Sequence, residues 1–341
     1  MPGNFRSALP CILAALILSG PAHAAASTPA SREKDGKQRF SADLARARSA
    51  KRPQWLASTP LEVAVTADYR EMRNAVDSRF GSGKSKEALR ILYELIDKGQ
   101  GRVQGWAVGY LPQALVWAQE IPFAVLEYEK RPDPDSLIRL GRCLLVYDQY
   151  SAALKYFSQA AASAPPEGQS KTVLLANAFW GAADAYRSMG DAAKAQEFFE
   201  KARREYEAEA SAPGKPGWLV QNMRKNAAIM VALAAAAANT PGGAYRDGAY
   251  SGTAKAYAGD IVVDVAVKGG KIADVKISRH AETITSGSLT EIPKRIIERQ
   301  TPSVDAVTGA TYTSEGIMCA VNDALKKALD LKALKSGVYT G

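Results

Sequence analysis

The sequence predicts an all-α helical array followed by a small α+β domain with an antiparallel sheet. A helical pattern runs from about Glu71 to Ala238, a cluster of helix breakers follows at 239–243, and the residues after it alternate as in β-strands. At 341 residues the chain is too long for one typical core. We therefore assign a helical domain to residues 61–238 and an α+β domain to residues 244–333.

The first 24 residues have the layout of a secretory signal peptide. Arg6 precedes an apolar run at 8–20, and Ala22-His23-Ala24 provides small residues for cleavage. No later stretch approaches the ~20 apolar residues that a membrane span needs. We expect a periplasmic or otherwise extracytoplasmic protein without a transmembrane segment after cleavage.

Residues 25–60 form a basic segment. Between Arg32 and Arg52 there are eight basic and three acidic residues, within a chain of formal net charge +9. This composition is typical of a solvated, partly disordered linker, and the alternative is a surface that contacts anionic lipid or an acidic partner. An exported chain with no basic-aromatic stripe is not expected to bind nucleic acid.

Cysteine and histidine are too scarce for a metal centre. Without the leader, only Cys143, Cys319 and His280 remain. Both cysteines lie in apolar helical patterns far apart in the chain, so we expect buried free thiols. These three residues cannot supply the usual zinc, haem or iron–sulfur ligand sets, and any redox role needs an organic cofactor.

Two helical segments resemble tetratricopeptide repeats. Residues 137–165 carry Gly141 and Phe157 at the expected offsets, and residues 179–202 repeat the pattern. Small residues let two antiparallel helices approach, and large apolar residues fill the space beside them. A weaker copy covers 81–96, and 217–238 reads as a terminal helix. The resemblance implies a scaffold that binds another protein.

The α+β domain is expected to start with strands. Ile261, Val263, Val265 and Val267 alternate with polar or small residues, and Gly269-Gly270 has the composition of a two-residue hairpin turn. A helix is expected over 289–300, and a final amphipathic helix carries a row of apolar residues at Ile317, Val321, Ala324, Leu325 and Ala328.

Before the final helix, residues 305–317 read DAVTGATYTSEGI, with four hydroxyl side chains around a Gly-Ala pair. Thr313 or Ser314 is predicted to cap this helix, and Glu315 to complement its dipole in the first turn. A helix start also attracts phosphate, and small neighbours would leave the backbone beside Thr311 open. A polar loop with a simple helix cap is the alternative.

The stretch DAVTGATYTS resembles the flavinylation motif, Asp-x-x-Ser/Thr-Gly-Ala-Thr, of the FMN-binding domain family. This family includes the C subunit of the sodium-translocating NADH:quinone reductase and the G subunit of the Rnf complex. The stretches YSGTAKAY, GGKIADVKI, RHAET and AVNDAL extend the resemblance, in the family's order, over about 244–330.

The resemblance implies FMN joined through its phosphate to the Thr311 hydroxyl. A flavin transferase makes this bond, taking the FMN half of FAD with a magnesium ion. The implied recognition residues are Asp305, Thr308, Gly309 and Ala310, Glu282 and Thr283 are expected to face the flavin, and Thr313 and Ser314 complete the cofactor site at the helix start. Where the family commonly reads Glu-Thr-Pro-Gly-x-Gly, this chain has ETITSGSL, so the wall beside the flavin ring is expected to differ. Tyr312 either stacks on the flavin or lies at the surface.

These features predict an exported electron-transfer flavoprotein with covalent FMN, docked by its helical repeats to an exported or membrane-bound redox partner. Two alternatives remain: an interaction scaffold or redox sensor with a vestigial flavin domain, and the flavin subunit of an exported reductase. Because no substrate-binding reductase domain is recognisable, an electron carrier is favoured over a stand-alone enzyme.

Overall fold

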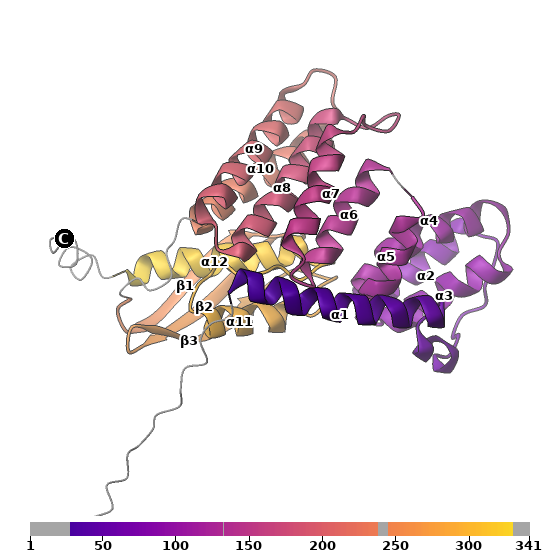
Figure 1. Cartoon of the computed structure of the whole chain (residues 1–341), viewed down its shortest axis with the longest axis horizontal. Helices are drawn as coiled ribbons and strands as arrows, with labels where there is room; N and C mark the ends of the chain where they lie inside the picture. The colour runs from indigo at the N-terminus through magenta and orange to yellow at the C-terminus, as the bar shows by residue number, and fades with distance from the viewer. Residues whose placement is uncertain (1–27, 132, 238–244, 330–341) are drawn as a thin grey trace, which may run out of the picture.

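The computed structural model describes residues 28–131, 133–237 and 245–329. The signal peptide predicted at 1–24 and the boundary predicted at 239–243 lie outside these residues. The helical part, shown in Figure 1, comprises α1 (Pro29–Ala50), the 3-10 helix η1 (Gln54–Ser58), α2 (Tyr69–Gly81), α3 (Ser85–Lys98), α4 (Gly101–Trp117), α5 (Ile121–Glu129), α6 (Pro134–Leu145), α7 (Tyr150–Ala162), α8 (Lys171–Met189), α9 (Ala192–Ser211) and α10 (Gly217–Ala237).

The C-terminal part is an antiparallel sheet with two helices on one face, which confirms the predicted fold class. It comprises β1 (Gly248–Lys255), β2 (Asp260–Lys268), β3 (Lys271–Arg279), α11 (Ser288–Arg299) and α12 (Thr311–Ala328). The strands pair in the order β1-β2-β3. Gly269 and Gly270 both have positive φ, as the predicted hairpin turn requires. The alternating valines of β2 are buried beneath α12.

The helices of the N-terminal part pack as consecutive antiparallel neighbours. The ring of Phe157 on α7 lies where a Cβ on Gly141 of α6 or Gly181 of α8 would be, within 2.5 Å of either position. Small residues therefore admit the large one, as the sequence pattern predicts. The placement of α6 to α9 agrees with two helical hairpins, while their identity as tetratricopeptide repeats stays a prediction.

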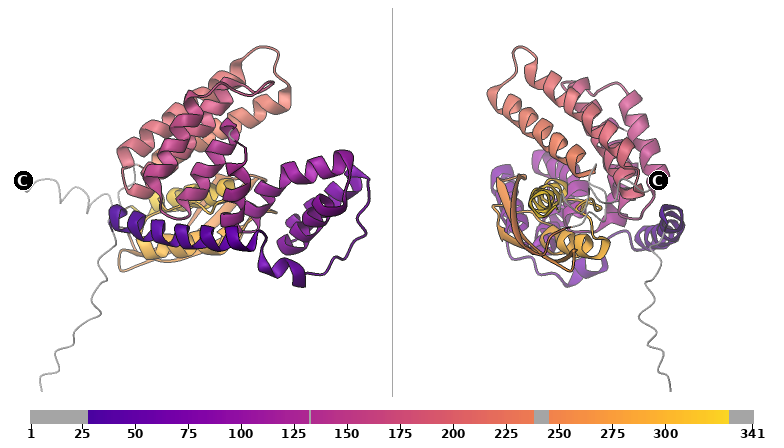
Figure 2. Two further views of the ribbon diagram at one scale, coloured as in Figure 1. Left: turned by 45° about the vertical axis from the view of Figure 1, so that its right-hand side comes forward. Right: turned by 90° about the vertical axis from the view of Figure 1, so that its left-hand side faces the viewer.

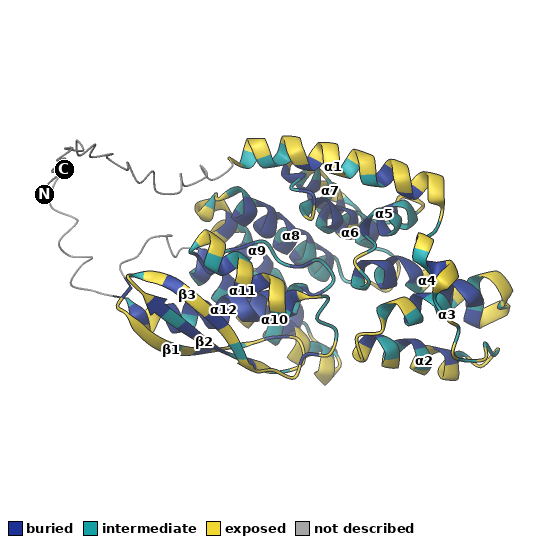
Figure 3. Ribbon diagram, turned by 90° about the horizontal axis from the view of Figure 1, so that it is seen from below, coloured by how far each residue is buried: buried dark blue, intermediate teal, exposed yellow. Residues whose placement is uncertain are grey.

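The prediction of a partly disordered linker is wrong for residues 29–50, which form α1. This helix packs so closely on the turn after α6 that a Cβ on Gly36 would lie 1.7 Å from the Tyr147 carbonyl oxygen. Leu44 and Ala47 are buried. Arg32 donates to the Ser188 carbonyl at 2.6 Å, and Arg39 pairs with Asp148 at 3.0 Å. Ion pairs within the chain thus use part of the basic charge that composition alone assigned to solvent. Most of the outer surface of α1 nevertheless stays exposed (Figure 3).

Helix α12 lies between the sheet and the helical domain. Figure 2 shows it end-on, with the strands on one side and α8 to α10 on the other. Its Val321 and Leu325 belong to the core under the sheet, whereas Cys319 packs into the core formed by α8, α9 and α10. The two domains therefore share an apolar interface. None of the described helices is long and apolar enough to cross a membrane.

Candidate functional site

Helix α12 begins at Thr311, and its cap lies three or four residues earlier than predicted. Its N-cap is Ala310, which has no side-chain capping bond, so the prediction of Thr313 or Ser314 as the cap is wrong. The Ser314 hydroxyl instead donates to the Ala310 carbonyl at 2.9 Å and accepts from the Val307 N–H at 3.0 Å. It closes the 305–310 loop onto the helix, and the first-turn amides lack intrahelical acceptors.

Three of the four serine and threonine hydroxyls in this stretch make protein hydrogen bonds. Besides Ser314, Thr308 donates to the Arg142 carbonyl at 3.2 Å, and Thr313 donates to the Glu282 carboxylate at 2.5 Å. Thr311 makes no such bond with any described residue, although its side chain is partly exposed and lines a cavity. The abundance of hydroxyls is thus explained by three that fix the loop and one that is left accessible.

Gly309 is required by its backbone and by its neighbour. Its φ is +93°, and a Cβ there would lie 3.0 Å from the Val116 carbonyl oxygen at the end of α4. Next to it, the Gln119 side chain donates to the Thr308 carbonyl at 2.8 Å. The helical domain therefore contacts the motif loop directly, at a position where only glycine fits without strain.

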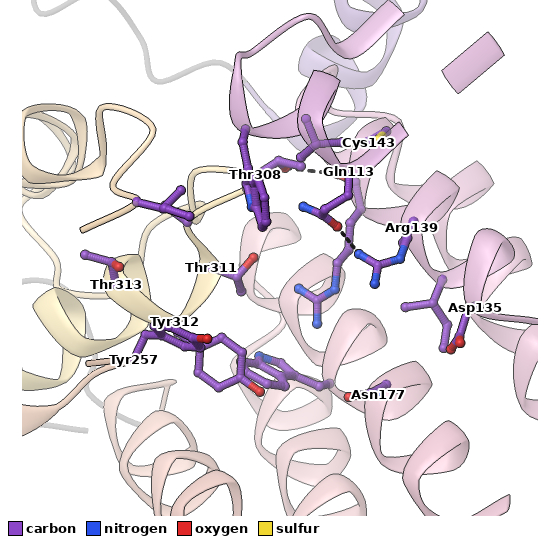
Figure 4. Close-up of a pocket in the computed structure, with 18 of the residues that line it drawn as sticks. Gln113, Asp135, Arg139, Cys143, Asn177, Tyr257, Thr308, Thr311, Tyr312 and Thr313 are labelled. Carbon is purple, nitrogen blue, oxygen red and sulfur yellow. Dashed lines mark hydrogen bonds between the residues drawn. The ribbon is translucent and has the colours of Figure 1, made fainter. Parts of the chain in front are cut away.

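The cavity beside Thr311 has a volume of about 450 Å³ and lies between the two domains. Figure 4 shows Thr311 facing into it, with Tyr257 and Tyr312 on one side and Arg139 and Asp135 across the space. The C-terminal domain contributes Thr308 to Thr313, Tyr257 and Ile284. The helical domain contributes the opposite wall from α4, α5, α6 and α8, including Gln113, Val116, Trp117, Tyr128, Arg139, Arg142, Cys143, Asn177 and Trp180.

This wall combines positive charge with aromatic surface. The Arg142 guanidinium lies 5.1 Å from the Trp180 ring centre and forms an ion pair with Asp184 at 3.0 Å. Trp180 meets Tyr312 edge to face at 4.9 Å, so Tyr312 belongs to the cavity and not to the outer surface. Arginine and aromatic faces suit a phosphorylated, planar heterocycle, and the volume is that of a small-molecule site.

The structure brings together five of the predicted site residues and places four outside the cavity lining. Thr308, Gly309, Ala310, Thr311 and Thr313 line it. Glu282 is buried behind Thr313 and accepts from the Ala258 N–H at 2.7 Å, while Thr283 is exposed. Ser314 lies within the loop, and Asp305 lies behind it.

Asp305 is a partly buried anchor for the loop and for α1. Its carboxylate pairs with Arg299 at 2.7 Å and lies 3.9 Å from Arg32. Burial alone would raise the Asp305 pKa, but the charge of Arg299, with help from Ser188 and Arg32, lowers it below the usual value. Its role is to position the motif from behind, on the side away from the cavity.

The departure from the family pattern at 282–289 coincides with the domain contact. Ile284 lines the cavity and packs against the core of the first helices. Ser286 donates to the Trp117 carbonyl at 3.1 Å. The segment that differs from the family pattern thus includes Ile284 and Ser286, which contact the helical domain.

A buried ion cluster joins the domains beneath the cavity. Arg187 of α8 donates to both carboxylate oxygens of Glu315 in α12, at 2.7 and 2.8 Å, and to Asp184 at 2.8 Å. All three side chains are at most 4% exposed. Glu315 therefore serves as an interdomain ligand for Arg187, and the first-turn role predicted for it is wrong because the helix starts at Thr311.

Asp184 should make stability pH-dependent. Burial, reinforced by the charge of Glu315, raises the Asp184 pKa to about 7 despite the nearby arginines. The folded state then holds a proton that the unfolded state has released, so this group's contribution to stability falls as pH rises from ~4 to ~7. Relative to wild type, Asp184→Asn should gain unfolding free energy by on the order of 2 kcal/mol between pH ~4.5 and ~6.5.

Urea unfolding at several pH values measures this difference. Asp35→Asn on the exposed face of α1 is the matched control and should run parallel to wild type. Parallel curves for Asp184→Asn would show that the Asp184 carboxyl gains no proton on folding.

The sequence pattern predicted none of the residues that the helical domain contributes to the cavity. A usable signal was Arg139 and Arg142, three residues apart in the otherwise apolar helix LIRLGRCLLV, where two cations on one face need a partner. Trp180 gave no such signal, since a tryptophan at that position reads as core. Both cysteines are buried free thiols, as predicted, and burial raises the pKa of Cys143 to about 12. His280 is exposed and outside the lining.

Comparison with known proteins identifies the C-terminal domain. Residues 256–326 match the family model described as FMN-binding domain. The chain is 32% identical over 95 residues to an NADH:fumarate oxidoreductase of Klebsiella pneumoniae, over 27% of this chain and 10% of that protein. It is 28% identical over 86 residues to an NADH:acrylate oxidoreductase of Vibrio harveyi, over 25% and 9%.

A third relative, a urocanate reductase of Eggerthella lenta, is 33% identical over 105 residues, which cover 30% of this chain and 17% of that protein. The chain thus spans at most about a sixth of the length of these relatives. No solved structure matches it. The matched segment shows that the chain carries an FMN-binding domain at residues 256–326, within its C-terminal part.

Proposed function

We propose that this chain is an exported electron-transfer flavoprotein that carries FMN through a phosphoester on Thr311. The observation that supports this most directly is that only one of the four serine and threonine hydroxyls in the motif has no hydrogen-bond partner in the part of the chain that the structure describes. Thr308, Thr313 and Ser314 are engaged, whereas the Thr311 hydroxyl faces a cavity of about 450 Å³ without a partner among the described residues.

The cavity's chemistry fits FMN. Arg139 and Arg142 can pair with a phosphodiester at Thr311, and the first-turn amides of α12 add positive potential there. Tyr312 and Trp180 offer apolar surface to a planar ring. The flavin supplies one- or two-electron chemistry, and the protein supplies position, charge and exclusion of water.

Attachment is a group transfer from FAD. The Thr311 oxygen forms a bond to the phosphorus of the FMN half, the pyrophosphate bond breaks, AMP leaves, and the threonine proton is released. The transferase supplies the magnesium ion and a base, so this chain needs only an unhindered hydroxyl. Thr311 at the first position of α12, flanked by Ala310, meets that need.

Export and partner choice complete the proposal. The leader-like residues 1–24 favour a periplasmic or other extracytoplasmic location, where a covalent bond prevents loss of the flavin by dilution. The relatives are named as fumarate, acrylate and urocanate reductases, and this chain matches only a small segment of each. Electrons would therefore pass between a membrane-bound or exported donor and a reductase on another polypeptide.

Coexpression with a flavin transferase in an exporting host tests this function. The mature protein, cleaved after Ala24, should appear as a fluorescent band on a denaturing gel and gain the mass of FMN less one water. The same chain without residues 1–24 stays in the cytoplasm and serves as the export control. Exported protein that remains colourless with an intact transferase present would favour the scaffold alternative.

A further inference from the structure

We propose that Trp180 of the helical domain donates its indole N–H to the flavin ring and thereby shifts the flavin's redox equilibrium. This inference rests on the proposed attachment at Thr311, and it makes the helical domain part of the cofactor site. It concerns a residue far outside the matched segment 256–326.

The indole N–H of Trp180 is a buried donor without an acceptor. The side chain is 2% exposed, and Nε1 has no hydrogen-bond partner among the described residues. A tryptophan N–H can only donate, and leaving such a group unpaired costs about 1–3 kcal/mol. Unpaired buried donors are rare in native proteins and call for a ligand or another specific explanation.

The neighbours of Trp180 fix its ring, and none of the described residues accepts a hydrogen bond from its N–H. Tyr312 packs edge to face at 4.9 Å, Tyr206 lies at 6.4 Å with an interplanar angle of 81°, and the Arg142 guanidinium lies over the ring at 5.1 Å. The Tyr206 hydroxyl donates to the Asn177 Oδ1 at 2.6 Å and forms no hydrogen bond with the indole N–H. Trp180 is thus held by packing while it lines the cavity that Thr311 also lines.

A flavin tethered at Thr311 would bring the missing acceptors into this cavity. Its ring carbonyls and nitrogens are hydrogen-bond acceptors, and hydrogen bonds to them tune the ring's electron affinity. A donor bonded to an electron-rich heteroatom stabilises the reduced ring more than the oxidised ring. Trp180 therefore favours the reduced flavin, and the Arg142 guanidinium over the Trp180 ring adds positive charge beside it.

The test compares Trp180→Phe with wild type, both flavinylated at Thr311. Phenylalanine keeps an aromatic ring against Tyr312 but removes the N–H. We expect the equilibrium between reduced and oxidised flavin to shift ~10-fold toward the oxidised form, or ~30 mV toward a more negative potential for a two-electron couple. The flavin absorption maximum should shift as well.

Trp218→Phe is the matched control. Trp218 is 66% exposed at the start of α10 and does not line the cavity. This variant should keep the potential and spectrum of wild type. Trp180→Phe with the same potential and spectrum as Trp218→Phe would overturn the proposal, because a residue that only packs would leave both unchanged.

A second measurement separates this inference from the attachment itself. In the Thr311→Ala background, binding of free FMN is followed by titration calorimetry, and Trp180→Phe should weaken it ~10-fold whereas Trp218→Phe should not. If Trp180→Phe weakens FMN binding but the wild-type protein carries no flavin adduct, covalent attachment is refuted and the role of Trp180 as a hydrogen-bond donor is supported. If the wild-type protein carries the adduct but Trp180→Phe changes neither the potential nor FMN binding, the role of Trp180 is refuted and covalent attachment is supported.

Discussion

Thr311→Ala is expected to abolish covalent flavinylation completely, so that the exported variant gains no mass and gives no fluorescent band on a denaturing gel. The reason is chemical: alanine has no oxygen to form the phosphoester, and the neighbouring hydroxyls are committed to the Arg142 carbonyl and the Glu282 carboxylate. Intact-protein mass spectrometry after coexpression with the transferase measures the result.

Three further variants serve as controls for Thr311→Ala. Thr311→Ser keeps a hydroxyl at the same place and should be flavinylated. Thr308→Ala and Thr313→Ala each remove a hydroxyl that fixes the loop, so they should retain the adduct at lower yield with a stability loss of about 1 kcal/mol each. An adduct that persists in Thr311→Ala would place the attachment on another residue.

Breaking the buried ion cluster should produce the largest loss of stability. Arg187→Met leaves the Glu315 carboxylate buried without its cation, while Asp184 keeps only its contact with Arg142 among the described cations. Removing one partner of a buried pair typically costs about 3–5 kcal/mol. Because Arg187 joins α8 to α12, scanning calorimetry should show the single transition of wild type split into separate transitions of the two domains.

The matched control is Arg203→Met on α9. Arg203 pairs with Glu200 and Glu207 at the surface, where such pairs contribute about 0–1 kcal/mol. Adding Glu315→Leu to Arg187→Met should restore much of the lost stability, since an apolar pair replaces the unpaired charge. If Arg187→Met and Arg203→Met unfolded alike, the cluster would not hold the domains together.

Much of the fold follows from local patterns in the sequence. Alternation from Ile261 to Val267 and the Gly269-Gly270 turn predict the β2–β3 hairpin, and the structure confirms both. The small-large pattern of Gly141 and Phe157 predicts the close packing of α6 and α7. These features succeed because each depends on residues near one another in the chain.

The site was predictable only in its C-terminal half. Thr311 and its neighbours stand in one continuous motif, whereas Arg142 and Trp180 reach the cavity through tertiary packing that no spacing reveals. The role of α1 was missed for the same reason, since Gly36 and Arg32 act on partners more than a hundred residues away. Composition suggested a solvated linker because it does not show where charges are paired.

Peptide mapping of the protein isolated from its native cell is the most direct test of flavin attachment at Thr311. Trypsin should release residues 300–326, between Arg299 and Lys326, in one peptide that contains Thr308, Thr311 and Thr313. The account predicts a mass increase of FMN less one water, localised by fragmentation to Thr311. An unmodified peptide, or an adduct on another of these threonines, would contradict it.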